Sequence, residues 1–218
     1  MVFAAGLEGL VSGELFKHAS VSLGRVFCGF SLTCLFALPL ACSIAAWPLL
    51  ERIVSVPLEF IRITPPLAAI PLLILWFGIG EGSKLALIIL ASFFPVFLSA
   101  LNGLRNVDDN LLEMGATIEL SPWKQFRFIK LPAALPMIIT GLRLGFGYSW
   151  RALIGAELIA AASGLGYMIL DAEELARTDR VFVGILLIGL LGYLFDTLFL
   201  KAATSISRRL ELSTGQLR

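Results

Sequence analysis

The sequence predicts an all-α integral membrane protein that forms a single domain over residues 1–218. Hydrophobic residues make up 58% of the 218 positions and charged residues only 15%, a composition far from that of soluble domains. The mean hydropathy is +0.89. Nearly uncharged stretches of about twenty residues, enough to cross the hydrocarbon of a bilayer, recur along the chain.

The charged, cysteine and histidine residues argue against several classes of protein. The net charge is +1 and the basic residues form no dense patch, so we expect no binding of nucleic acid. Cys28, Cys34 and Cys42 match the spacing of no zinc or redox motif and read as small apolar packing residues. With His18 as the only histidine, a metal cluster or a Ser-His-Asp site is hard to build. We therefore expect neither an enzyme nor a cofactor bound by this chain.

Residues 1–22 are expected to lie outside the hydrocarbon. They are only modestly apolar, with Glu8, Glu14, Lys17 and His18 among them. They lack the basic start, apolar core and small-residue cleavage site of a signal peptide. The sequence favours a short interfacial helix at the start of the chain.

About five spans follow from the positions where the chain can cross hydrocarbon with little charge. Their predicted ranges are 26–50, 63–80, 85–104, 133–162 and 181–200. Pro65, Pro66 and Pro71 predict that the second span is kinked or partly unwound at its cytoplasmic start. Gly141 and Gly145 form a small-xxx-small pair in the fourth span, which supports close packing against another helix.

The fourth span holds most of the ionisable groups within the membrane. Arg143 reads best as an anchor at the cytoplasmic end of the span. Arg151 has two interpretations, an ion pair with Glu157 or Asp196, or a place on the translocation pathway where its guanidinium meets an oxyanion. The weaker pathway candidates are Glu157, Trp150, Thr64 and Trp76. The alternative for Glu157 is the ion pair with Arg151, and for the other three it is ordinary packing.

One long polar passage, residues 112–136, interrupts the apolar segments. Asp108, Asp109 and Asn110 can cap a helix that enters this passage. Ser121-Pro122 breaks that helix, because proline cannot donate a backbone hydrogen bond. Aromatic residues then alternate with Lys124, Arg127 and Lys130, a pattern typical of the membrane interface. The passage therefore predicts a helix, a turn and a second helix that re-enters the membrane.

The same passage resembles the EAA loop of binding-protein-dependent ABC importer permeases. Its pattern is Glu-Ala-Ala, three residues, Gly, nine residues and Ile-x-Leu-Pro. The residues in register are Glu113, Met114, Gly115, Ile129, Leu131 and Pro132. Glu119 stands where the pattern has glycine, and Ser121-Pro122 could supply the bend two residues later. Residues 60–84, FIRITPPLAAIPLLILWFGIGEGSK, and 156–169, AELIAAASGLGYMI, resemble the branch that imports nitrate, sulfonates and taurine.

The resemblance implies a type I ABC importer permease. Two copies of the permease would line one pathway for a small, anionic solute, with a substrate-binding protein outside and a cytoplasmic ABC ATPase dimer that binds ATP and Mg. The 105–132 loop, including Leu120 and Ser121, would dock on that ATPase as the coupling helix. Members of this branch commonly have one more helix upstream of the region corresponding to Met1. A secondary carrier or channel without an ATPase is the alternative, and nitrate, sulfonates, taurine, bicarbonate and a heterocyclic precursor stay open as substrates.

Basic residues that flank the spans predict the orientation in the bacterial inner membrane. On the side of the 105–132 loop lie Arg52, Arg62, Arg105, Lys124, Arg127, Lys130, Lys201, Arg208, Arg209 and Arg218. The other side keeps Lys17, Arg25, Lys84, Arg177 and Arg180. This bias places the loop and the 201–218 tail in the cytoplasm, and residues 1–22 outside. The mixed charges of residues 166–180 then form an extracytoplasmic surface, either simply solvated or a docking surface for the binding protein.

Overall fold

The computed structural model describes residues 2–215, together with their side chains except those at 202 and 205–215. These residues form helices and connecting turns, and no strand is present among them. In chain order the elements are α1 (Val2–Val11), α2 (Glu14–Ala46), α3 (Pro48–Ile63), the 3-10 helix η1 (Pro66–Ala69), α4 (Ile70–Phe77), α5 (Glu81–Arg105), α6 (Asp109–Thr117), α7 (Pro122–Gln125), the π-helix η2 (Phe126–Lys130), α8 (Leu131–Ala160), α9 (Leu165–Glu174) and α10 (Thr178–Gly215).

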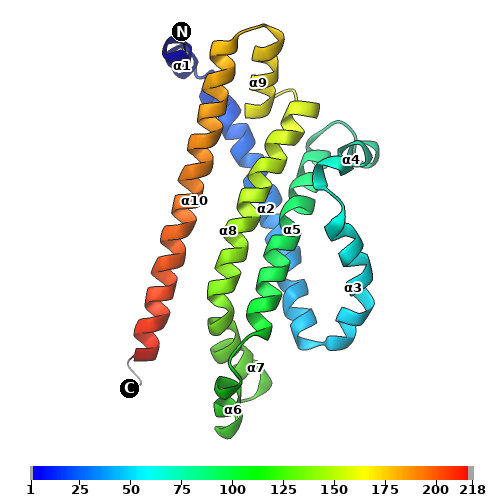
Figure 1. Ribbon diagram of the computed structural model, residues 1–218, viewed down its shortest axis with the longest axis vertical. Helices are drawn as coiled ribbons and strands as arrows, with labels where there is room; N and C mark the ends of the chain where they lie inside the picture. The colour runs from blue at the N-terminus through cyan, green and yellow to red at the C-terminus, as the bar shows by residue number, and fades with distance from the viewer. Residues whose placement is uncertain (1, 216–218) are drawn as a thin grey trace.

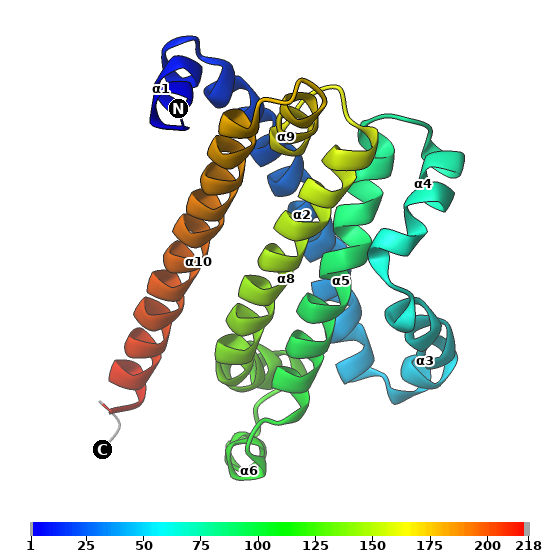
Figure 2. The ribbon, with the colours of Figure 1, turned by 45° about the horizontal axis from the view of Figure 1, so that its top comes forward.

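Three long helices, α2, α5 and α8, form the centre of a helical bundle (Figure 1, Figure 2). α10 lies along one side of this core, and α3 and α4 lie on the other side beside α5. α1 and α9 are at one end of the bundle, and α6 and α7 are at the opposite end. We call these the α9 end and the α6 end.

The prediction of an all-α membrane protein with about five spans is confirmed. Four helical segments are long and apolar enough to cross a membrane, namely Glu14–Ala46, Glu81–Arg105, Pro122–Ala160 and Thr178–Lys201. A fifth span is formed if Pro48–Ile63 and Pro66–Phe77, which meet at 92°, cross together as one broken span. The spans predicted at 85–104, 133–162 and 181–200 correspond to α5, α8 and α10. The predicted 201–218 tail continues α10 as far as residue 215, and residues 216–218 lie outside the described part.

The first span is longer at its start than the predicted range of 26–50. Gly13, with a φ of 74°, separates α1 from α2, and α2 then runs unbroken from Glu14. The charge within this helix is tolerated because Arg25 is buried against two carboxylates from other helices. The predicted end at residue 50 was also late, since Pro48 opens α3 near its first helical position.

The second span departs most from its predicted range of 63–80. Residues 48–63, which carry several charges and lie mostly outside the predicted spans, form helix α3. The break predicted at Pro65 and Pro66 is confirmed, but it lies in the middle of the broken span and not at its start. Some charges of α3 are neutralised by ion pairs, which explains why a charged segment can be helical here. Glu51 accepts a hydrogen bond from Arg105 at 2.9 Å.

Small residues let α5 and α8 approach closely. A Cβ atom added at Gly145 would lie 2.5 Å from Cγ2 of Val96. One added at Gly141 would lie 2.5 Å from Cβ of Ser99. Both neighbours belong to α5, so the close packing predicted for this glycine pair is confirmed and its partner is α5.

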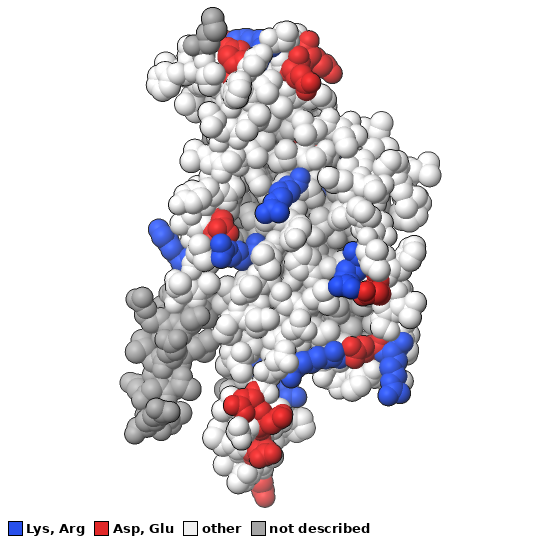
Figure 3. All heavy atoms as spheres, in the orientation of Figure 1, with Lys and Arg blue, Asp and Glu red and all other residues white. Residues whose placement is uncertain are grey.

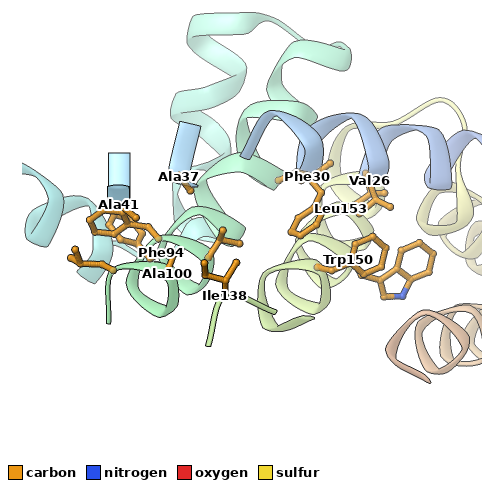
Figure 4. Close-up of a cluster of buried hydrophobic side chains, with 14 of the residues drawn as sticks. Val26, Phe30, Ala37, Ala41, Phe94, Ala100, Ile138, Trp150 and Leu153 are labelled. Atoms are coloured by element: carbon orange, nitrogen blue, oxygen red, sulfur yellow. The ribbon is translucent and has the colours of Figure 1, made fainter. Parts of the chain in front are cut away.

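The hydrophobic core fills the space between α2, α5 and α8. Buried side chains from the three helices, such as Phe30, Phe94 and Leu153, interdigitate there (Figure 4). Within this core the hydroxyls of Thr33 and Ser92 are 2.8 Å apart and join α2 to α5. The core thus joins α2, α5 and α8 into one packed unit.

Candidate functional site

The 105–132 loop folds as the helix, turn and helix expected from its sequence. The carboxylate of Asp108 accepts a hydrogen bond from the backbone N–H of Asn110 at 2.9 Å and caps α6. Asp109 places negative charge in the first turn, near the positive end of the helix dipole. Arg105 reaches Glu51 and ties the start of the loop to α3. The predicted cap is confirmed.

Helix α6 ends in a Schellman turn that is centred on Glu119. Glu119 has a φ of 54°, in the left-handed region. Its N–H donates to the carbonyl of Ala116 at 2.9 Å, and the N–H of Leu120 donates to that of Gly115 at 3.0 Å. Such a position favours glycine, which accounts for the glycine of the EAA pattern. The bend is therefore at Glu119 itself, and the proposed shift to Ser121-Pro122 is wrong.

The second half of the loop folds back on α6. Pro122 starts α7 directly after Ser121. The side-chain amide of Gln125 donates to the carbonyl of Leu112 at 2.9 Å. Gly115 is buried, and a Cβ atom at this position would lie 2.5 Å from Cδ1 of Ile129. Contact between Gly115 and Ile129 therefore makes the loop one compact unit.

A π-helical turn joins the loop to the membrane helix α8. The N–H of Leu131 donates to the carbonyl of Phe126, five residues back. Pro132 follows and has no N–H, and its ring would crowd the carbonyl of residue 128 in a regular α-helix. The wider turn gives the ring room, so the Leu131-Pro132 pair sets how the chain re-enters the bundle.

One side of α6 is exposed and largely apolar. Leu111, Met114 and Ile118 are 40%, 54% and 63% exposed. Their spacing of three and four residues puts them on one helix face, and the exposed Glu113 lies on the flank of α6 beyond Met114. We call Leu111, Glu113, Met114 and Ile118 the α6 patch. An apolar patch at the end of a bundle, rimmed by charge, is typical of a protein interaction site.

The outer face of α8 carries one stripe of exposed side chains, which we call the α8 stripe. Its members Leu144, Tyr148, Arg151 and Ile159 recur at helical spacing. The guanidinium carbon of Arg151 lies 5.5 Å from the centre of the Tyr148 ring. The ion pair expected between Arg151 and Glu157 or Asp196 is not formed. Glu157 pairs with Arg25 instead, and Asp196 pairs with Arg143.

Glu157 lies in a buried polar network at the α9 end. Its carboxylate, fully buried, accepts hydrogen bonds from Arg25 at 2.8 Å, from the hydroxyl of Ser22 and from the N–H of Gly166 at 3.0 Å. Arg25 also donates to both carboxylate oxygens of Glu81, at 2.6 and 2.7 Å. The network joins α2, α5, α8 and α9. Glu157 could contact a solute in the pathway only if this network opened.

The turn between α8 and α9 closes over this carboxylate. Gly164 has a φ of 118°, and a Cβ atom there would lie 2.2 Å from Oε1 of Glu157. The N–H of Gly164 donates to Nδ1 of His18 at 3.1 Å, and that of Leu165 donates to the hydroxyl of Ser22 at 2.9 Å. The small residues of the 156–169 segment are thus needed to enclose a carboxylate.

The other pathway candidates are not gathered into one site. Thr64 and Trp76 line a cavity of about 580 Å³ between α3, α4 and α5, whose wall is mostly apolar. Trp150 is only 6% exposed, and its indole N–H faces Gly192 of α10 without a hydrogen-bond partner among the described residues. Of the predicted candidates, Arg151 alone lies on the α8 stripe.

Sequence reasoning missed the polar partners at the α9 end. Ser22, Arg25 and Glu81 fell in or beside segments interpreted as solvated or interfacial. The available signal was Arg25 itself, an arginine at the edge of an apolar stretch, which requires a carboxylate within reach. Which carboxylate it meets depends on the packing of three helices.

Comparison with known proteins agrees with this architecture. Residues 37–208 match the family model described as binding-protein-dependent transport system inner membrane component. The chain is 39% identical over 214 residues to the taurine transport system permease protein TauC of Escherichia coli (strain K12), covering 98% of this chain and 76% of that protein. It is 40% identical over 190 residues to the putative aliphatic sulfonates transport permease protein SsuC of Bacillus subtilis (strain 168), covering 87% and 69%.

A solved structure of the MetNI methionine ABC transporter in an inward facing conformation superimposes with a TM-score of 0.71. It covers 85% of this chain and 92% of that chain at 18% identity, which shows the fold alone. The fold is that of a type I ABC importer permease, and the resemblance seen in the sequence is confirmed. The chain belongs to the family of binding-protein-dependent transport system inner membrane components, as a multi-pass permease of the nitrate, sulfonate and taurine branch of ABC importers.

Proposed function

We propose that this permease carries small sulfonate-like anions through the membrane, driven by an ATPase that docks on the α6 patch. Two copies of the chain form the pathway, a dimeric cytoplasmic ATPase binds and hydrolyses ATP with Mg, and a binding protein delivers the solute from outside. The relatives named for taurine and aliphatic sulfonates support this substrate class. The α6 patch is the observation that supports the docking site most directly.

The loop is built to transmit movement without deforming. The Schellman turn at Glu119, the Gln125 side chain and the contact between Gly115 and Ile129 fix α6 relative to the start of α8. The ion pair of Arg105 with Glu51 adds α3 to the same unit. Closure of the ATPase dimer would therefore move α5 and α8 together with α6, and change the pathway between inward-open and outward-open states.

A charge reversal in the α6 patch tests the docking site without knowledge of the substrate. We expect Glu113→Lys to abolish co-purification with the ATPase, because it reverses a charge in the contact, while the thermal stability of the permease stays unchanged. The matched control is Glu174→Lys, a reversal at another exposed glutamate, in α9 at the other end of the bundle. If both variants retain the ATPase equally, the α6 patch is not the docking site.

A carrier or channel that works without an ATPase predicts a different result. Uptake of radiolabelled taurine in cells that express the complete importer should stop when ATP is depleted and should also be lost in Glu113→Lys. Unchanged uptake by ATP-depleted cells would support the carrier or channel. Uptake of neither taurine nor ethanesulfonate by the wild-type importer, with the ATPase bound, would refute the substrate class alone.

A further inference from the structure

We infer that the α8 stripe holds an oxyanion subsite of the pathway, in which Arg151 binds the anion and Tyr148 orients Arg151. A second copy of the chain completes the site with the same pair of residues. This inference rests on the proposed function and names the group in the membrane that recognises the anion.

The depth of Arg151 in the span is the first step. Counted from the end of α8 at Ala160, taken as the edge of the hydrocarbon, it lies nine residues deep, about 14 Å at 1.5 Å per residue. That is close to half of a hydrocarbon core of about 30 Å. A guanidinium at this depth faces the interior of an assembly or a water-filled cavity, because lipid cannot solvate it. The stripe around Arg151 is therefore not a lipid-facing surface.

The second step is that other arginines in the spans have carboxylate partners among the described residues, whereas Arg151 has none there. Arg25 is held by Glu157 and Glu81, and Arg143 is held by Asp196 at 2.6 Å. Within the described part of the chain, Arg151 has no carboxylate within ion-pair distance. Its charge is thus left free in a molecule that pairs comparable arginines, and a free guanidinium favours an anionic ligand.

The surroundings of Arg151 match a small organic anion. The guanidinium carbon of Arg151 lies over the Tyr148 ring, 5.5 Å from its centre. The structure gives its N–H groups no acceptor among the described residues, and such N–H groups bind sulfonate or carboxylate oxygens in pairs. Leu144 and Ile159, 50% and 63% exposed, offer apolar contact for a short carbon chain. The side of the bundle that shows α8 between α10 and α5 is mostly uncharged (Figure 3). Acidic groups gather towards its ends in Figure 3, and those nearer the middle lie beside basic groups.

A single copy leaves the stripe open along one side. Water can reach the middle of the bilayer only if another surface encloses the stripe, and a second copy related by a two-fold axis supplies one. The same axis would place two guanidiniums across one pathway. An anion in transit would then contact both copies, which explains why Arg151 needs no carboxylate of its own chain.

Cysteine accessibility tests the subsite with a probe of known chemistry. In the complete importer, with Cys28, Cys34 and Cys42 changed to alanine, Leu144→Cys reports on the stripe. Leu190→Cys on α10, 64% exposed, is the matched control for a lipid-facing leucine. The probes are the anionic sulfonatoethyl and the cationic trimethylammonioethyl methanethiosulfonates, each normalised to its rate with a free thiol.

We expect Leu144→Cys to react at least tenfold faster than Leu190→Cys, and to prefer the anionic probe. Arg151→Gln should lower that preference by about tenfold, the size of one charge-assisted hydrogen bond, and Arg151→Lys should retain most of it. The Gln variant should still co-purify with the ATPase, which separates this test from that of the α6 patch. Equal reactivity of the two cysteines, an unchanged preference in Arg151→Gln, or loss of the assembled complex in that variant would overturn the subsite.

Discussion

At the scale of single residues, Glu119 occupies a left-handed backbone conformation that costs a residue with a Cβ atom about 1 kcal/mol or more. The surrounding turn supplies two hydrogen bonds that hold it there, from the N–H groups of Glu119 and Leu120. The loop thus keeps the shape of the family pattern without its glycine. The structure also has a second left-handed residue, Ala176, in an equivalent turn at the end of α9.

Replacing Glu119 with glycine should strengthen this turn. Relief of the strain predicts slower hydrogen exchange at the Leu120 amide, by roughly fivefold for about 1 kcal/mol of local stability. Ala176→Gly is the matched control, because it should slow exchange at the Arg177 amide, which donates to Ala172, and leave the loop unchanged. Faster exchange at Leu120 in Glu119→Gly would show that the glutamate side chain stabilises the turn.

Glu157 is the residue on which stability at the α9 end depends most. Glu157→Gln leaves Arg25 buried with one carboxylate fewer, so we expect a loss of about 3–5 kcal/mol in the free energy of unfolding. The measurement is the melting temperature of the purified permease in detergent. Glu59→Gln, which removes half of an exposed pair on α3, should hardly change it. Similar shifts in both variants would contradict a special role for the buried network.

At the scale of elements, the contact between α5 and α8 depends on missing side-chain atoms. Gly145→Ala forces a Cβ atom against Val96 and should cost about 1–3 kcal/mol of stability. Gly147→Ala makes the same change two residues away in α8, where no atom lies within 4 Å, and should be neutral or slightly stabilising. Thermal unfolding of the two variants in detergent decides the point. Equal stability would mean that α8 can move away from α5 without cost.

The long apolar helices could be predicted from the sequence, and the broken span could not. α5, α8 and α10 contain apolar stretches long enough to cross the membrane, so hydropathy and length are enough to predict their positions in the sequence. α3 carries Glu51, Arg52, Glu59 and Arg62, and local charge alone indicates a loop there. Glu59 and Arg62 pair within α3, but Glu51 pairs with Arg105 of α5, a partner that no local pattern reveals.

At the scale of the whole molecule, local sequence patterns again do not reveal which distant residues meet in the candidate site. The sequence singles out the loop and Arg151 as candidates because each stands out from its local surroundings. The ion pairs of Arg25 with Glu157 and of Arg143 with Asp196 join residues 132 and 53 positions apart. Charge counts show that such pairs are needed in an apolar bundle, but only the packing of α2, α8 and α10 decides which residues meet.

The orientation of the molecule is the property on which the proposed function depends most, and it follows from charge alone. Arg105, Lys124, Arg127 and Lys130 surround the α6 end, and positive flanks stay in the cytoplasm. With the three native cysteines removed, an impermeant maleimide should label Glu173→Cys of α9 in intact cells. It should label Glu113→Cys of α6 only after the cells are permeabilised. Labelling of Glu113→Cys in intact cells would place α6 outside, where no ATPase can reach it, and the coupling proposal would fail.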